Sequence, residues 1–343
     1  MEKKFELTEN YVVNEFGTKL YQIKCTKTFE YAKEGEIGGF IEKEENLSQE
    51  GDAWVYGNAR VYGNAQVLGN AQVLGDAWVS DNARVEGYAW VEGYAQVSDD
   101  ARVLGDARVY GNARVEGNAW VSGNARVEGN AWVYGDAQVY GDARVLGDAR
   151  VSGNARVEGN AWVYGDARVL GDARVLGDAR VLGNARVSDD ARVLGDARVL
   201  DNARVYGNAR VSGNARVSGD ARVAGNARVS GNARVSDDAW VFGNARVFGN
   251  ARVSGNARVY GDACLKSDAD HCGFDCFGSS NRHTHAYLTS DNTVEITCGC
   301  FRGSIGEFEK RVKNTHAGTV YENQYNAIIN VIKIKFGLDE TSK

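Results

Sequence analysis

A six-residue unit, Ala-x-Val-x-Gly-Asn or Ala-x-Val-x-Gly-Asp, repeats from Ala53 to Val259 without an insertion or a deletion. Every sixth residue from Val55 to Val259 is Val, which makes 35 copies. Side chains alternate along a strand, so Ala and Val point to one face and the variable residue between them points to the other. Gly with Asn or Asp then supplies a corner, because these residues tolerate left-handed backbone conformations. Asp replaces this Gly at Asp81, Asp99, Asp189, Asp201 and Asp237.

Such short strands cannot bury their apolar faces alone, but stacked coils bury a continuous core of Ala and Val. Six residues per side favour a triangular coil of 18 residues, and the 35 copies then form about 12 coils. A two-sided or right-handed solenoid is the alternative. An aliphatic residue followed four positions later by a small one, as in Val55 and Ala59, resembles the hexapeptide-repeat family. That resemblance implies a left-handed parallel β-helix within an all-β solenoid class.

The segments before the repeat carry a more specific resemblance. Residues 21–25 read as a strand of an N-terminal β cap over residues 1–50, which would protect the first edge of the solenoid. Residues 38–42, 46–51 and 54–56 resemble the entry segment of YdcK-like hexapeptide-repeat proteins of bacterial and prophage genomes. The resemblance covers residues 1 to about 262 and implies a phage or prophage origin.

Residues 264–343, after the β-helix of residues 51–263, read as a small α+β domain. Residues 284–289 and 293–298 alternate around a turn and predict a β-hairpin. Ser304 and Glu307 form a capping-box pattern, which predicts the start of a helix. A second helix is expected over residues 321–336, with one apolar face. This order resembles a small domain of phage-encoded proteins, and the resemblance implies no activity. The apolar face of this second predicted helix consists of Tyr325, Ile328, Ile329 and Ile332.

The outward residue between Ala and Val is mostly Arg, and sorting it by every eighteenth position predicts an Arg ladder on each face. Arg forks with interspersed Trp suit a polyanion or another partner. Residues 51–262 contain 24 Arg against 25 acidic residues, so pairing with acidic corners and mutual neutralisation is the competing interpretation. The candidate partner-binding residues are Arg180, Arg198, Arg216, Arg234, Arg252, Trp162 and Trp240.

Five of the six Cys lie between Cys264 and Cys300, which predicts either a local metal site or reduced thiols. Four thiolates, or three with one of the nearby residues His271, His283 and His285, suit tetrahedral zinc and would hold together a domain with a thin core. Partly buried, reduced Cys residues are the alternative. The candidate zinc ligands are Cys272, Cys276, Cys298 and Cys300; no other cofactor is expected.

Catalysis is not expected. Acyltransferases with this fold resemble one another in using a His base from a loop that leaves the coil. In this chain all four His residues follow the repeat. No run of 18 apolar residues and no secretory signal are present, so we expect a cytoplasmic protein without a membrane partner. The function we expect is a solenoid scaffold that binds a protein partner through the C-terminal domain or a solenoid face. Open alternatives are a phage inhibitor of a host defence system such as a CRISPR nuclease, nucleic-acid or nucleotide binding through the Arg/Trp ladders, and homo-oligomerisation.

Overall fold

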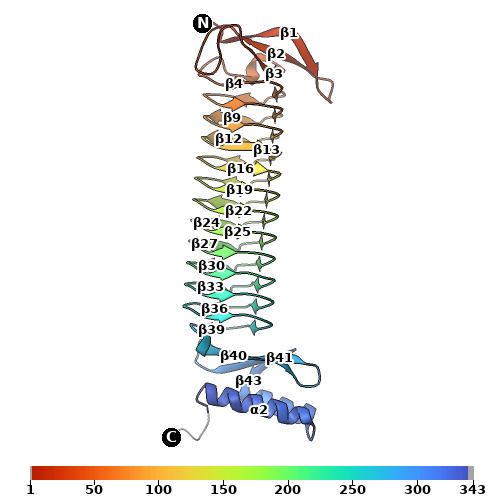
Figure 1. Ribbon diagram of the computed structural model, residues 1–343, viewed down its shortest axis with the longest axis vertical. Helices are drawn as coiled ribbons and strands as arrows, with labels where there is room; N and C mark the ends of the chain where they lie inside the picture. The colour runs from red at the N-terminus through yellow and green to blue at the C-terminus, as the bar shows by residue number, and fades with distance from the viewer. Residues whose placement is uncertain (1, 339–343) are drawn as a thin grey trace. The chain divides into compact units, whose positions relative to one another are not determined.

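The computed structural model describes residues 2–338 and divides into two compact units, Met1–Asn184 (unit 1) and Ala185–Lys343 (unit 2) (Figure 1). The boundaries of the predicted segments 1–50, 51–263 and 264–343 stay predictions, and their first residue and last five residues lie outside the described range. Neither described helix is long and apolar enough to cross a membrane.

Both units are built from coils of three short strands, one strand every six residues from β4 (Trp54–Val55) to β38 (Arg258–Val259). Each strand pairs in parallel with the strand 18 residues later. In unit 1, β5 (Arg60–Val61) pairs with β8 (Trp78–Val79), and in unit 2, β26 (Arg186–Val187) pairs with β29 (Arg204–Val205). The predicted triangular parallel β-helix with 18 residues per coil is confirmed.

The core consists of the Ala and Val side chains of the repeat. All of them from Ala53 to Val259 have at most 3% of their surface exposed. The residue between them points outward, as the alternation predicts, and Arg198 and Arg216 are exposed examples. Identical small side chains therefore stack directly on one another through each unit, and every strand buries its apolar face against the next coil.

The corners use left-handed backbone, with φ between +56° at Gly57 and +83° at Gly87. Asp99 and Asp237 adopt the same conformation at φ +58°. Asp99 Oδ2 accepts a hydrogen bond of 2.9 Å from the backbone N–H of Gly117, in the next coil. This bond stabilises a conformation that an L residue otherwise adopts at a cost, which explains why Asp alone replaces Gly.

The residue after the Gly forms a second ladder along the corners. Asn112 Nδ2 donates to Asn130 Oδ1 at 3.1 Å, and Asn130 Nδ2 donates to Asp148 Oδ1 at 2.8 Å. Many Asp carboxylates of the repeat thus accept from an Asn amide of the preceding coil. The amide and carboxylate groups at the corners hold neighbouring coils in register.

The solenoid has about 13 turns, rather than the 12 predicted from the repeat. The difference arises because segments without the repeat motif join the sheets. In β3 (Ile37–Ile41), Ile41 lies opposite Val61, and Leu47 forms a bridge to Val67. In β39 (Cys264–Leu265), Leu265 lies opposite Val247. Ile and Leu can therefore occupy the position of Val, and the solenoid extends beyond the residues that match the strict motif.

An antiparallel hairpin of β1 (Phe5–Val13) and β2 (Lys19–Cys25) covers the N-terminal edge of the coils, and β2 pairs with β3 in antiparallel orientation. Lys4 Nζ, which is buried, donates to the carbonyl oxygens of Gly51 at 3.1 Å and Ala53 at 2.9 Å. Desolvation lowers the pKa of Lys4 to about 8. The cap predicted at this end therefore satisfies carbonyl groups that the first coil leaves unpaired.

After β39 the chain forms a four-stranded antiparallel sheet in the order β40 (His271–Phe277), β41 (Arg282–Leu288), β42 (Val294–Cys298) and β43 (Phe301–Ser304). The helices α1 (Ile305–His316) and α2 (Val320–Lys335) cover one face of this sheet (Figure 1). The hairpin and both helices were predicted, and Ser304 caps α1 with Glu307 as expected. The strands β40 and β43 were not predicted.

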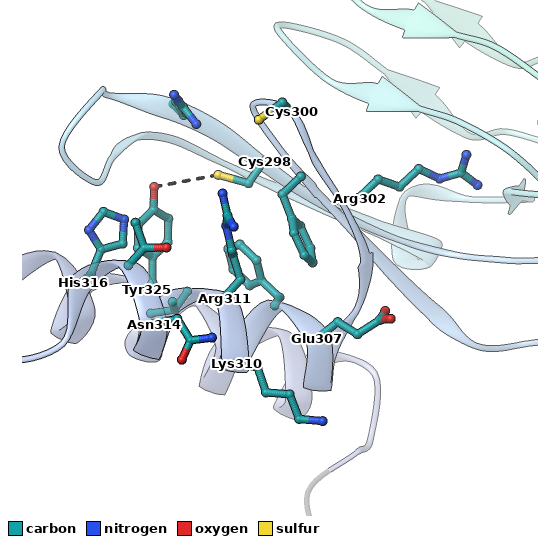
Figure 2. Close-up of a pocket in the computed structure, with 14 residues that line it drawn as sticks. Cys298, Cys300, Arg302, Glu307, Lys310, Arg311, Asn314, His316 and Tyr325 are labelled. Carbon is teal, nitrogen blue, oxygen red and sulfur yellow. Dashed lines mark hydrogen bonds between the residues drawn. The ribbon is translucent and has the colours of Figure 1, made fainter.

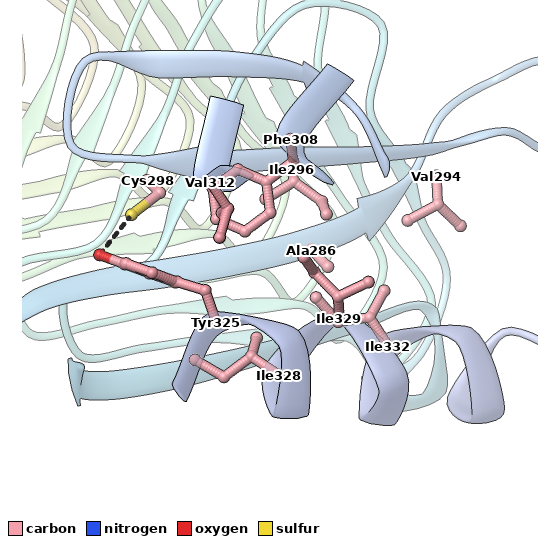
Figure 3. Close-up of a cluster of buried hydrophobic side chains, with 10 residues drawn as sticks. All are labelled: Ala286, Val294, Ile296, Cys298, Phe308, Val312, Tyr325, Ile328, Ile329 and Ile332. Carbon is pink, nitrogen blue, oxygen red and sulfur yellow. Dashed lines mark hydrogen bonds between the residues drawn. The ribbon is translucent and has the colours of Figure 1, made fainter. Parts of the chain in front are cut away.

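Helix and sheet meet in a compact apolar core (Figure 3). Ile329 and Ile332 of α2 point toward Ala286 and Ile296 of the sheet, and Tyr325 reaches Cys298. All four residues predicted for the apolar face of α2 are buried here.

We expect replacement of a corner Gly by Ala to destabilise unit 1 according to the space beside it. At Gly117 a Cβ atom would lie 2.9 Å from the backbone N of Gly135, whereas at Gly57 the nearest atom is 3.7 Å away. Both positions have positive φ, which costs an Ala residue about 1–2 kcal/mol. Urea unfolding should show that Gly117→Ala loses more stability than Gly57→Ala. Equal losses would mean that contact between coils does not limit the corner.

Candidate functional site

The predicted Arg and Trp residues lie on two different sheets. Trp162 lies beside Arg144 and Arg180 in neighbouring coils of unit 1, with their guanidinium groups 4.9 and 5.4 Å from its ring centre. Trp240 belongs to another sheet, where Arg222 and Arg258 approach its ring to 4.7 and 5.0 Å. Each Trp ring thus contacts Arg on both neighbouring coils, which leaves little ring surface for an outside ligand.

Four predicted Arg residues of unit 2, Arg198, Arg216, Arg234 and Arg252, do lie on successive strands and are exposed. Of the repeat Arg residues in the described chain, Arg84 alone forms an ion pair, to Glu86 at 2.8 Å. Neutralisation by acidic corners stays a prediction; at Asp148 and Asp178 of unit 1 the corner carboxylate accepts from an Asn amide.

The four candidate zinc ligands lie in different environments. Cys298 is buried in the domain core, Cys272 packs against the same core, and Cys276 and Cys300 are exposed. Burial raises the pKa of the Cys272 thiol to about 11, which disfavours the thiolate that a metal needs. Within residues 2–338 no three His, Cys, Asp or Glu side chains are grouped to hold a metal ion. Zinc stays a prediction.

The sheet face opposite the helices packs on the last coil of unit 2 through buried polar groups. His285 Nδ1 lies 3.1 Å from the carbonyl oxygen of Arg258 and donates to it. Because that nitrogen carries a proton, His285 Nε2 accepts from Nδ1 of His271, 3.0 Å away. Thr297 Oγ1 donates to the same Arg258 carbonyl at 3.3 Å. The sequence placed His271 and His285 near the Cys residues, but it did not predict these contacts, because one partner is a backbone group of the repeat.

We expect His285 to make the docking of this sheet sensitive to acid. Desolvation, helped by the nearby His271, lowers the pKa of His285 to about 3, against about 6.5 in an unfolded chain. The unfolded state therefore binds the proton first as the pH falls from 6.5 to 3, and stability is lost by at most about 1.4 kcal/mol per pH unit. Urea unfolding followed by the helical circular dichroism signal should show this loss, and His285→Asn should reduce it. An unchanged pH dependence in the variant would contradict the assignment.

A cavity of about 520 Å³ lies between α1, the N-terminal part of α2 and the β42–β43 turn (Figure 2). Its inner wall is aromatic: Phe308 lies 5.1 Å from Phe301 and 5.7 Å from Tyr325, measured between ring centres. His316 stacks on Tyr325 at 5.4 Å. Phe308 and Tyr325 are buried, whereas Phe301 and His316 are half-buried at the opening.

The cations around this cavity differ in direction and pairing. Arg311 extends from α1 toward β42, whereas Lys310 also lines the cavity but directs its side chain away from β42 (Figure 2). Arg302 is paired with Glu295. Arg282, on the wall formed by β41, packs against the turn at Gly299. Within residues 2–338, Arg282 and Arg311 have no ion-pair partner.

The helix α2 is apolar on its exposed side as well. Val331 is 47% exposed, Ile334 61% and Leu338, just after the helix, 48%. Together with exposed Ala327, they follow the helical spacing of one face. We call Ala327, Val331, Ile334 and Leu338 the α2 stripe. The α2 stripe could have been predicted from the sequence, because its residues recur at helical spacing between the predicted core residues.

Comparison with known proteins supports a β-solenoid repeat protein. The family model described as YdcK Beta solenoid repeat matches residues 53–69, 77–93, 107–123, 119–135, 137–150, 149–165, 203–217, 227–242 and 251–265. No curated protein matches the chain.

Among solved structures, a UDP-N-acetylglucosamine acyltransferase from Campylobacter jejuni is similar over 75% of this chain and 81% of its own, with 12% identity and a TM-score of 0.38. The UDP-N-acetylglucosamine acyltransferase of Francisella novicida is similar over 46% of this chain, with 16% identity and a TM-score of 0.24. The chain spans 66% of that protein's length.

Proposed function

We propose that this β-solenoid is a non-catalytic interaction protein that binds a protein partner through the α2 stripe. The observation that carries the proposal is the exposure of Val331, Ile334 and Leu338 on one face. Exposed apolar patches with a regular helical spacing are typical of surfaces that dock against another protein. The opposite face of α2 already fills the domain core, so the stripe is not needed for folding.

The anchoring of the domain supports this role. The backbone N–H of Ser290 donates to the carbonyl oxygen of Asp262 at 2.8 Å, and the N–H of Tyr260 donates to the hydroxyl of Tyr287 at 3.3 Å. With the contacts at Arg258, these bonds fix the sheet to the last coil. A surface held in this way loses little conformational entropy when it binds.

We expect Val331→Asp with Ile334→Asp to abolish binding, because a partner's apolar surface would have to bury two unpaired charges. The partner is first recovered with the full-length protein from host lysate after nuclease treatment and identified. Its affinity is then measured with purified proteins, where we expect at least a tenfold loss.

The matched control is Asn326→Asp with Asn330→Asp, which adds the same charge at exposed positions of α2 beside the stripe. It should leave the affinity nearly unchanged, and both variants should keep the helical circular dichroism signal. If both variants bind equally well, the stripe is not the contact surface. If the wild type alone dimerises, the stripe joins two copies of this chain and the proposal of a separate partner fails.

An inhibitor of a host defence system would be one form of this function, with a host nuclease as the partner. Its support is the resemblance of the N-terminal and C-terminal segments to prophage and phage proteins. The test is phage infection of hosts that carry such a system, with and without this protein.

The unpaired Arg ladder of unit 2 supports polyanion binding as a second candidate function. Arg198, Arg216, Arg234 and Arg252 lie at strand spacing and form no ion pair within residues 2–338, and guanidinium donors suit phosphate oxygens. We expect weak binding of single-stranded DNA that falls steeply with salt. Arg216→Gln with Arg234→Gln should reduce both the affinity and the salt slope in a fluorescence anisotropy titration. Binding that does not depend on salt would contradict this function.

A further inference from the structure

The cavity beside α1 takes no part in the proposed contact, because the α2 stripe lies on the exposed side of the other helix. The cavity combines a buried aromatic wall with two cations that have no ion-pair partner among residues 2–338. Its volume of about 520 Å³ falls within the range of roughly 300–1,000 Å³ that small-molecule sites occupy. The chemistry of the lining then indicates what such a molecule would carry.

The charges favour an anion with several acceptor oxygens. Arg311 extends from α1 across the opening (Figure 2), and Arg282 lines it from β41. Their planar guanidinium groups donate in pairs, a geometry that matches phosphate oxygens. Glu307 also lines the cavity, but its carboxylate accepts from the N–H and hydroxyl of Ser304, so it is committed to the helix cap.

The rings favour a planar apolar group on the same molecule. Phe301 and His316 are half-buried at the opening, and each is backed by a buried ring, Phe308 or Tyr325. Tyr325 is itself held in place, because its hydroxyl contacts Cys298 Sγ at 3.8 Å. A planar group can therefore pack against rings that do not move away, which makes the contact favourable.

From this arrangement we infer that the cavity binds a phosphate monoester that also carries a planar ring. Arg311 and Arg282 hold the phosphate, and Phe301 and His316 contact the ring. The same chemistry occurs in a free nucleoside monophosphate and in a phosphorylated Tyr side chain. This binding site is independent of the α2 stripe and of any protein partner.

Isothermal titration of the purified full-length protein with AMP, GMP, CMP, UMP and a phosphotyrosine peptide tests the inference. We expect saturable binding of at least one of them, and at least tenfold weaker binding of inorganic phosphate and of the matching unphosphorylated compound. Preference for a nucleotide or for the peptide identifies the source of the ligand. Absence of binding by all five would overturn the inference.

The variants Arg311→Ala and Arg282→Ala should each weaken binding at least tenfold. Lys313→Ala is the matched control: it removes the same charge from an exposed position of α1 that does not line the cavity, so binding should change less than twofold. An equal loss in all three variants would mean general charge attraction and would overturn the site. All the replaced side chains are exposed, so the fold should persist, which circular dichroism checks.

Discussion

The stacking of each coil on the next in constant register is the constraint on which the rest of the structure depends. Val61 lies on Val79, and the N–H of Arg60 donates to the carbonyl oxygen of Ala77 at 2.9 Å, a pattern that recurs through both units. Insertion of one residue would turn Val outward and break this ladder. Variation is therefore confined to outward positions and corners, and function must lie there or outside the repeat.

The same constraint creates open edges, and the two ends close them differently. At the N-terminal end, side chains reach the carbonyl groups of the first coil: Lys4 contacts Gly51 and Ala53, and Asn46 Nδ2 donates to Ala65 at 2.8 Å. At the C-terminal end, a whole sheet docks through His285 and Thr297. The N-terminal hairpin only covers the edge of the first coil, whereas the C-terminal sheet covers the last coil and also carries two helices.

The repeat could be read from the sequence because one short motif determines both burial and backbone conformation at each step. The capping box at Ser304 and the hairpin were predictable for the same reason, since their contacts are local. The strand β40 was missed because a bulge between Phe274 and Phe277, with Cys276 at φ +62°, interrupts the alternation of residues 271–277, although they pair with the next strand of the chain, β41. The cavity was also missed, because Arg282 and Arg311 meet only through the packing of α1 on the sheet.

The two helices show why recognition fits the C-terminal domain better than the coils. Both helices bury one face in the same core, so the exposed faces are free to differ. The exposed positions of α1 include Lys310, Lys313 and Asn314, which suit contact with water. Those of α2 include Val331 and Ile334, whose exposure costs solvation free energy in the free protein. Neither residue is part of the domain core, and this difference between the helices supports the proposal that a partner binds the α2 stripe.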